Sequence, residues 1–82
     1  MEWTLKDGKL VNTYVFKSQT ALAQFITTIA HKADEINHHP DYKVSKAFTL
    51  EISLFTHDTN AVTEIDYTLA SFISELVYCN VN

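Results

Sequence analysis

The chain has 82 residues, a net charge of −4, six lysines and no arginine. This balance argues against binding to nucleic acid or an anionic membrane, which requires a concentrated basic footprint, but it is compatible with a small anionic ligand. With 46% hydrophobic residues, one glycine and one proline, the composition excludes a disordered or linker-rich chain. We therefore expect a single domain over residues 1–82, whose small core favours assembly into an oligomer.

Nothing in the sequence predicts export or membrane insertion. Cys79 is the only cysteine, so no intrachain disulfide can form, and we expect a reducing compartment in which Cys79 is a packing residue. No apolar run approaches the ~20 residues of a membrane span. Residues 1–4 lack the basic and then apolar order of a secretory signal. The expected location is the cytoplasm.

The first expected element is a β-hairpin, because Asp7-Gly8 is typical of a two-residue type I′ turn. This turn would place three pairs of residues opposite one another: Lys6 and Lys9, Leu5 and Leu10, and Trp3 and Asn12. Since strand side chains alternate, one face of the hairpin would be apolar. That face would consist of Trp3, Leu5, Leu10, Tyr14 and Phe16.

A helix is expected next, capped by Ser18 and running to about residue 37. Pro40 cannot donate a backbone N–H and disfavours helical backbone in the residue before it, so the helix should close near His38. Apolar residues recur three or four positions apart and form one stripe. The members of this stripe are Leu22, Phe25, Ile26, Ile29, Ala33 and Ile36.

Residues 42–57 form a second expected β region, although Asp41–Lys46 is too short and polar to define a strand by itself. His57 falls on the polar face of this region and should point toward an open sheet surface. A last helix should follow Thr63, which forms a capping-box pattern with Asp66 in place of the usual Glu or Gln. The apolar side chains of the strand are Phe48, Leu50, Ile52 and Leu54, and those of the helix are Val62, Ile65, Leu69, Phe72, Ile73 and Leu76.

Three histidines at element ends suggest a proton-transfer site, because imidazole has an unperturbed pKa near neutrality. They are His38, His39 and His57. Asp34 lies one helical turn before His38 and could orient it, or it could be an ordinary solvated helix carboxylate. The structural alternative is that His38 is a helix-end residue beside the helix dipole and that His57 is an exposed strand-end residue. A zinc site with His57 or Asp34 as third ligand is a weaker alternative, because no helical His-x-x-x-His or Cys-x-x-Cys pair is present.

These residues belong to a longer joint pattern: Asp34, His38-His39-Pro40, Tyr42 and Thr56-His57-Asp58. The pattern resembles the pterin-4a-carbinolamine dehydratase family, whose mark is an acidic residue, three residues, His-His-Pro and an aromatic, followed by a strand ending in Thr-His-Asp or Thr-His-Glu. The likeness continues through residues 63–66 and 69–73, and covers roughly residues 14–77.

The resemblance implies an α+β fold, with a four-stranded antiparallel sheet, helices on one face and the order β-β-α-β-β-α. It also implies dehydration of 4a-hydroxytetrahydropterin in tetrahydrobiopterin recycling, with no metal or cofactor. His38 and His57 would transfer protons. His39 would bind the pterin and take part in catalysis, and Pro40, Tyr42 and Asp34 would complete the binding site.

The chain departs from the family in two respects. It lacks the N-terminal helix common in the family, and the spacing from Pro40 to His57 is one residue longer, which a β-bulge could absorb. We expect a homodimer or homotetramer that joins through the strand Phe48–His57. The alternative function is a non-catalytic dimerisation or interaction module on the same fold.

Overall fold

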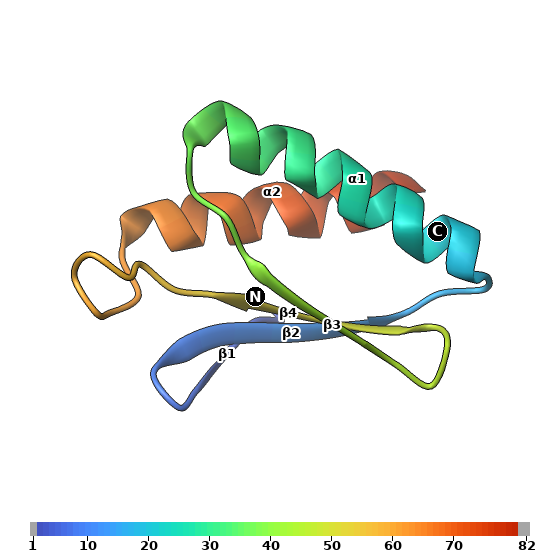
Figure 1. The fold of residues 1–82 in the computed structure, drawn as a ribbon, viewed down its shortest axis with the longest axis horizontal. Coiled ribbons are helices and arrows are strands. Elements are labelled where there is room, and N and C mark those ends of the chain that lie inside the picture. Colours follow the sequence, from blue (N-terminus) through green and yellow to red (C-terminus); the bar gives the residue numbers. More distant parts are fainter. Residues whose placement is uncertain (1, 81–82) are drawn as a thin grey trace.

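The protein, described here by a computed structural model for residues 2–80 and for the side chains of residues 2–77, has two helices on one face of a four-stranded antiparallel sheet (Figure 1). This is the expected α+β order, and among the described residues no helix precedes the first strand. The side chain of Cys79 lies outside the described side chains. In chain order the elements are β1 (Thr4–Lys6), β2 (Lys9–Val15), α1 (Gln19–Ile36), β3 (Asp41–Ser45), β4 (Thr49–Leu54) and α2 (Glu64–Asn80).

The β1–β2 hairpin forms as predicted. Asp7 and Gly8 both have positive φ, 53° and 77°, as a type I′ turn requires. The register pairs Lys6 with Lys9 and Leu5 with Leu10, and the pairing ends at Thr4 with Val11, one residue short of the expected Trp3–Asn12 pair. Leu5 is 62% exposed, because β1 is an edge strand with a neighbour on only one side.

Helix α1 begins where the sequence predicts and ends slightly earlier than expected. Ser18 Oγ accepts a hydrogen bond from the Ala21 N–H at 3.1 Å. At the other end Asn37 adopts left-handed backbone with φ 52°, and the His38 N–H reaches back to the Ala33 carbonyl at 3.0 Å. This Asn37 cap ends the helix before both histidines, so neither imidazole follows helical spacing.

The prediction that the strand Phe48–His57 joins two chains is wrong, because this strand lies inside the sheet. Asp41–Ser45 is a strand, and it pairs with β4 on the side away from β2, so the sheet order is β1-β2-β4-β3. Strand β4 therefore has neighbours on both sides and cannot pair across a two-fold axis; the free edges belong to β1 and β3. Phe48 lies in the turn before β4 and is 43% exposed. The β3–β4 ladder pairs one to one throughout and contains no bulge.

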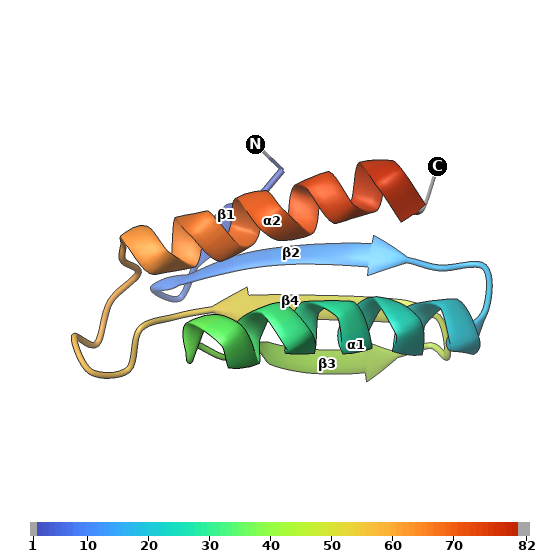
Figure 2. The ribbon, with the colours of Figure 1, turned by 90° about the horizontal axis from the view of Figure 1, so that it is seen from above.

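The core lies between the sheet and the helices, with α1 over β3 and β4 and α2 over β1 and β2 (Figure 2). The two helices run in opposite directions. The end of α1, the start of β3, the end of β4 and the start of α2 therefore meet at one end of the molecule (Figures 1 and 2). The side chains with no exposed surface at the centre of the core include Ile29, Leu50, Ile52, Leu54, Leu69 and Ile73.

No helix in the described part of the chain is long and apolar enough to cross a membrane.

Candidate active site

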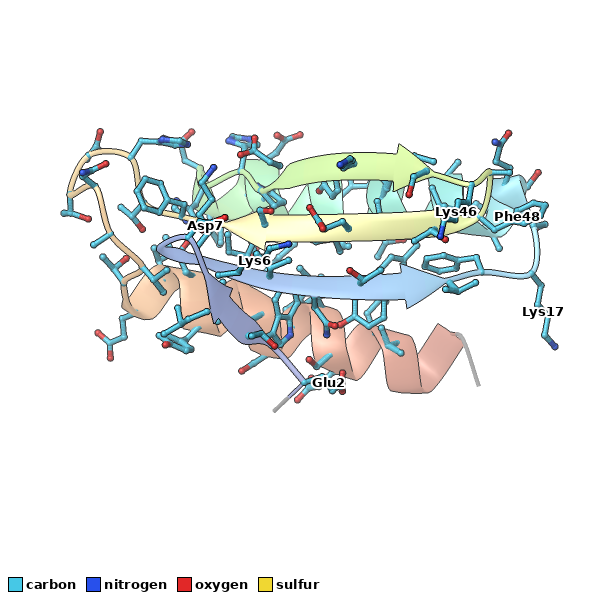
Figure 3. All side chains as sticks on the ribbon, turned by 90° about the horizontal axis from the view of Figure 1, so that it is seen from below. Glu2, Lys6, Asp7, Lys17, Lys46 and Phe48 are labelled. Carbon is cyan, nitrogen blue, oxygen red and sulfur yellow. The ribbon has the colours of Figure 1, made fainter. Side chains whose placement is uncertain are left out.

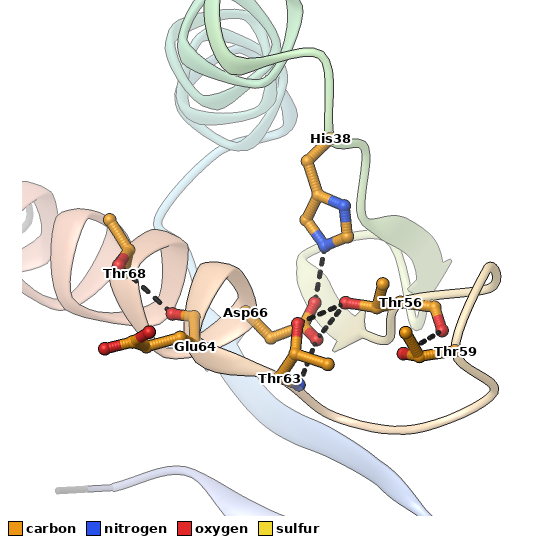
Figure 4. A network of polar contacts seen from close by, with 7 residues as sticks. All are labelled: His38, Thr56, Thr59, Thr63, Glu64, Asp66 and Thr68. Atoms are coloured by element: carbon orange, nitrogen blue, oxygen red, sulfur yellow. Dashed lines mark hydrogen bonds and ion pairs between the residues drawn. The ribbon is translucent and has the colours of Figure 1, made fainter.

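Among the described residues, the shortest side-chain hydrogen bond joins His38 to Asp66. His38 lies in the segment between α1 and β3, and Asp66 lies in the first turn of α2. Figure 4 shows the imidazole reaching down onto the carboxylate, with His38 Nε2 at 2.6 Å from Asp66 Oδ1. The His38 side chain is 14% exposed and that of Asp66 is fully buried. Two segments far apart in the sequence thus build one buried hydrogen-bonded site.

Asp66 also accepts hydrogen bonds at its second carboxylate oxygen. Oδ2 accepts from the Thr63 backbone N–H at 2.9 Å and from the Thr56 hydroxyl at 2.7 Å. Burial by itself would raise the pKa of Asp66, but the hydrogen bonds from His38, Thr63 and Thr56 outweigh it and hold that pKa below its ordinary value. The carboxylate is therefore ionised at neutral pH and can only accept hydrogen bonds.

The ionised state of Asp66 determines which ring nitrogen of His38 carries the proton of their contact. Because Asp66 Oδ1 can only accept, His38 Nε2 must carry a proton and donate it to this contact. The other ring nitrogen, Nδ1, points away from Asp66 (Figure 4). It is the nitrogen that His38 can use to exchange a proton with a bound molecule.

The sequence pointed to Asp66 only as a helix cap. Its carboxylate does cap α2 through the Thr63 N–H, but the Thr63 hydroxyl lies 2.7 Å from the Thr56 hydroxyl, so the side chains of the capping box serve the buried network (Figure 4). The available sign in the sequence was Asp at the position where a capping box usually has Glu or Gln. A shorter acid at this position keeps its carboxylate close to the helix start, where His38 reaches it.

His39 forms a second, exposed pair with Asp34. His39 Nε2 is 2.8 Å from Asp34 Oδ1, with the two side chains 56% and 73% exposed. The expected contact between Asp34 and His38 is therefore replaced by one with His39. The reason is the left-handed Asn37, because residues four apart face each other only while the helix continues.

His57 is the first residue of a turn rather than the last residue of a strand. Strand β4 ends at Leu54, and Thr56 and Ala61 exchange two backbone hydrogen bonds, at 3.0 and 3.3 Å, that close the turn. The His57 carbonyl accepts from the Asn60 N–H at 3.2 Å. The imidazole is exposed, as expected. Its neighbour Thr56 is bonded to Asp66, so a short chain of hydrogen bonds ties the backbone beside His57 to His38.

Tyr42 lies on β3 opposite Ile52, on the face that the helices cover. Its hydroxyl is buried without a hydrogen-bond partner. Burial, and to a smaller extent the charge of Asp34, raises the pKa of Tyr42 to about 12. Pro40, two residues earlier in the sequence, is also buried. Two of the predicted binding residues thus lie at or directly before the start of β3. The remaining histidine, His31, is exposed on α1.

Among the described residues, no group of three His, Cys, Asp or Glu side chains is placed to hold a metal ion. Three of the donors proposed for zinc are engaged with other side chains: His38 with Asp66, and His39 and Asp34 with each other.

Known proteins share this sequence and this architecture. The family model described as pterin 4 alpha carbinolamine dehydratase matches residues 1–76. A protein of Herpetosiphon aurantiacus with the provisional name pterin-4-alpha-carbinolamine dehydratase is 36% identical over 74 residues, which are 90% of this chain and 76% of that protein. A relative from Nostoc punctiforme with the same provisional name is 34% identical over 74 residues, 90% of this chain and 78% of its own length.

Two solved structures share the fold. A crystal structure described as a transcriptional coactivator/pterin dehydratase from Brucella melitensis superimposes with a TM-score of 0.82 at 26% identity, covering 90% of this chain and 80% of that one. A pterin dehydratase-like protein described as a RuBisCO assembly factor in the alpha-carboxysome superimposes with a TM-score of 0.70, covering 90% and 84%. At 19% identity, this second likeness concerns the fold alone.

Proposed function

The chain belongs to the pterin 4 alpha carbinolamine dehydratase family, and on that premise we propose that it converts a 4a-hydroxytetrahydropterin to a quinonoid dihydropterin. Family membership supports a dehydratase function. In the reaction the 4a-hydroxyl takes up a proton and leaves as water, N5 loses its proton, and the C4a–N5 bond becomes double. The net change is the loss of one water, which requires one proton donor and one proton acceptor.

The contact between His38 and Asp66 is the observation that carries the proposal. A catalytic imidazole needs a fixed orientation and one nitrogen free of the protein, and the 2.6 Å contact at Nε2 provides the first while leaving Nδ1 for the second. A positioned acid or base of this kind contributes typically ~10²–10⁴-fold to the rate. We assign proton transfer to His38 together with His57, whose exposed ring can complete the donor and acceptor pair.

The remaining predicted residues are assigned to substrate binding. His39, held by Asp34 at 2.8 Å, would contact the pterin and support proton transfer. Pro40 and Tyr42 would support the ring from the start of β3. The assignment includes tetrahydrobiopterin recycling in the cytoplasm as the setting, which rests on the single cysteine and on the family.

The deciding experiment measures dehydration of synthetic 4a-hydroxytetrahydropterin by the purified, metal-free protein, followed by ultraviolet absorbance. We expect a rate clearly above that of buffer. Circular dichroism on the same sample provides the control that the protein is folded. A folded sample with no rate above buffer would contradict the enzyme assignment.

The second candidate is a non-catalytic interaction module. It is favoured by one observation, namely that the structural neighbour described as a RuBisCO assembly factor has this fold at a TM-score of 0.70. The network of His38, Thr56 and Asp66 would then serve stability alone. The dehydration assay on the wild type separates the two candidates, because an interaction module would show no activity. An interaction module would also keep its fold and its partner binding when His38→Ala is introduced.

We also propose that the protein is a homo-oligomer, a dimer or tetramer. A small chain has a limited core, and the free edges of β1 and β3 are where sheets join. Light scattering at tens of micromolar should give more than one chain per particle. A pure monomer, or an unfolding midpoint that does not move with protein concentration, would exclude an obligate oligomer.

A further inference from the structure

The ring of His57 is restrained in a different way from the other two predicted site histidines. His38 and His39 each place a ring nitrogen on a carboxylate. Among the described residues no hydrogen bond or ion pair holds the His57 ring. It packs instead against Phe55, with ring centroids 5.2 Å apart and the planes 76° apart. An exposed side chain without such a contact would sample several rotamers, and an edge-to-face pair favours one.

Phe55 is itself held in place. It directly follows β4 and is only partly exposed. Figure 3 shows the sheet face that no helix covers. The register pairs the buried residues Leu10 and Leu54, so by strand alternation their neighbours Lys9 and Phe55 project to this opposite face. The Lys9 ammonium lies 5.9 Å from the centroid of the Phe55 ring, within the range of a cation–π contact. The ring of Phe55 thus contacts both Lys9 and His57.

The backbone around His57 is already fixed, so the side chain is the remaining variable. Thr56 on one side is bonded to Asp66, and the turn closed by Thr56 and Ala61 fixes the other side. We infer that Phe55 is a positioning residue, which holds the imidazole of His57 in one orientation for proton transfer. This inference rests on the proposed function. Among the described residues no hydrogen bond takes up a nitrogen of the His57 ring, so both can exchange protons with the substrate.

The kinetic test replaces Phe55 with leucine, which keeps an apolar side chain and removes the ring. We expect kcat to fall roughly 3–10-fold, the range that one aromatic contact supports, with KM within about 2-fold. Phe55→Tyr keeps the ring and should restore kcat. Phe48→Leu, which changes an exposed phenylalanine in the β3–β4 turn, is the matched control and should leave kcat unchanged.

A double variant separates positioning from general structural damage. If Phe55 acts through His57, adding Phe55→Leu to His57→Ala should lower the rate no further. The inference fails if Phe55→Leu has the kcat of the wild type, or if it lowers the rate as much without the imidazole as with it.

A spectroscopic arm keeps the inference testable even if the chain has no dehydratase activity, in which case the proposed function alone would fail. NMR on the wild type should show nuclear Overhauser effects between the ring protons of Phe55 and His57, and χ1 couplings for one His57 rotamer. In Phe55→Leu those couplings should become averaged, and in Phe48→Leu they should not change. Averaged couplings in the wild type, or couplings that Phe55→Leu leaves unchanged, would overturn it.

Discussion

Two histidines adjacent in the sequence, His38 and His39, each pair with a carboxylate, and the two pairs differ in burial and in the elements that they connect. The pair of His38 and Asp66 is buried and connects the segment after α1 with the first turn of α2. The pair of His39 and Asp34 is exposed and connects that same segment with the last turn of α1. Their N–O distances are similar, 2.6 and 2.8 Å. A distance alone therefore does not rank the two contacts.

The two pairs differ in their exposure to solvent and in the number of further hydrogen-bond partners of the carboxylate. Exposed ion pairs typically contribute ~0–1 kcal/mol, because water and salt screen them. Removing one partner of a buried carboxylate leaves a charged oxygen unsatisfied, and removing the carboxylate leaves all of its donors unsatisfied; either change costs several kcal/mol. Asp66 has Thr56 and Thr63 as further partners. We therefore expect the two pairs to respond very differently to the same substitutions.

The largest expected effect is that of Asp66→Ala on stability. The change leaves His38, the Thr56 hydroxyl and the Thr63 N–H without their acceptor, so the free energy of unfolding should fall by about 3 kcal/mol. Urea denaturation at one fixed protein concentration measures it. The matched substitution Asp34→Ala should cost about 0.5 kcal/mol or less. Equal losses would show that burial does not distinguish the pairs.

The comparison extends to catalysis. His38→Ala should lower kcat by ~10²-fold or more without unfolding the protein, because a positioned acid or base is lost, and His57→Ala should do the same. His39→Ala should raise KM more than it lowers kcat, because this exposed residue is assigned mainly to binding. Steady-state kinetics of dehydration separate these effects. His31→Ala is the control on the exposed face of α1, and a loss as large as that for His57→Ala would refute the assigned roles.

Acid should weaken the buried pair through Asp66. Its pKa is lowered in the folded state, so the folded protein binds fewer protons than the unfolded chain in the acidic range. The stabilisation is therefore fully present above the unfolded pKa of about 4 and is lost as pH falls through the lower folded value. Urea denaturation of the wild type and of Asp66→Asn should show a stability difference that shrinks below about pH 4. A difference that stays constant with pH would contradict this assignment.

The smallest expected effect concerns Tyr42, beside the exposed pair. Its hydroxyl is buried without a partner, so Tyr42→Phe should leave the free energy of unfolding unchanged or raise it by up to about 1 kcal/mol at neutral pH. The raised folded pKa, about 12 against 10.0, favours the neutral phenol. The stabilisation linked to this shift is fully present below the unfolded pKa of 10.0 and is lost as pH rises through the folded pKa of about 12.

The alkaline loss should therefore be weaker in Tyr42→Phe than in the wild type, as compared by urea denaturation at pH 8 and about pH 11. Tyr67→Phe, at an exposed tyrosine of α2, is the control for general alkaline effects. Identical alkaline curves for the wild type and Tyr42→Phe would show that the Tyr42 phenol does not titrate differently on unfolding.

Local patterns in the sequence were enough to predict most elements. Asp7-Gly8 predicted the turn of the first hairpin, Ser18 the start of α1, and Thr63 with Asp66 the start of α2, and the structure confirms all three. The motif around His38 and His57 identified the family. These features succeed because turn, cap and alternation signals depend on residues close together in the chain.

The partners of the histidines, in contrast, were decided by tertiary structure. Asp34 lies four positions before His38, the spacing of a contact within a helix, but Asn37 ends the helix and His38 instead meets Asp66, 28 residues away. Likewise the sequence predicted that β4 would be free to pair with a second chain, whereas in the structure β3 pairs with that side of β4. Which carboxylate an imidazole meets depends on how α2 packs against the end of α1, and burial between those elements is what makes the contact of His38 with Asp66 strong.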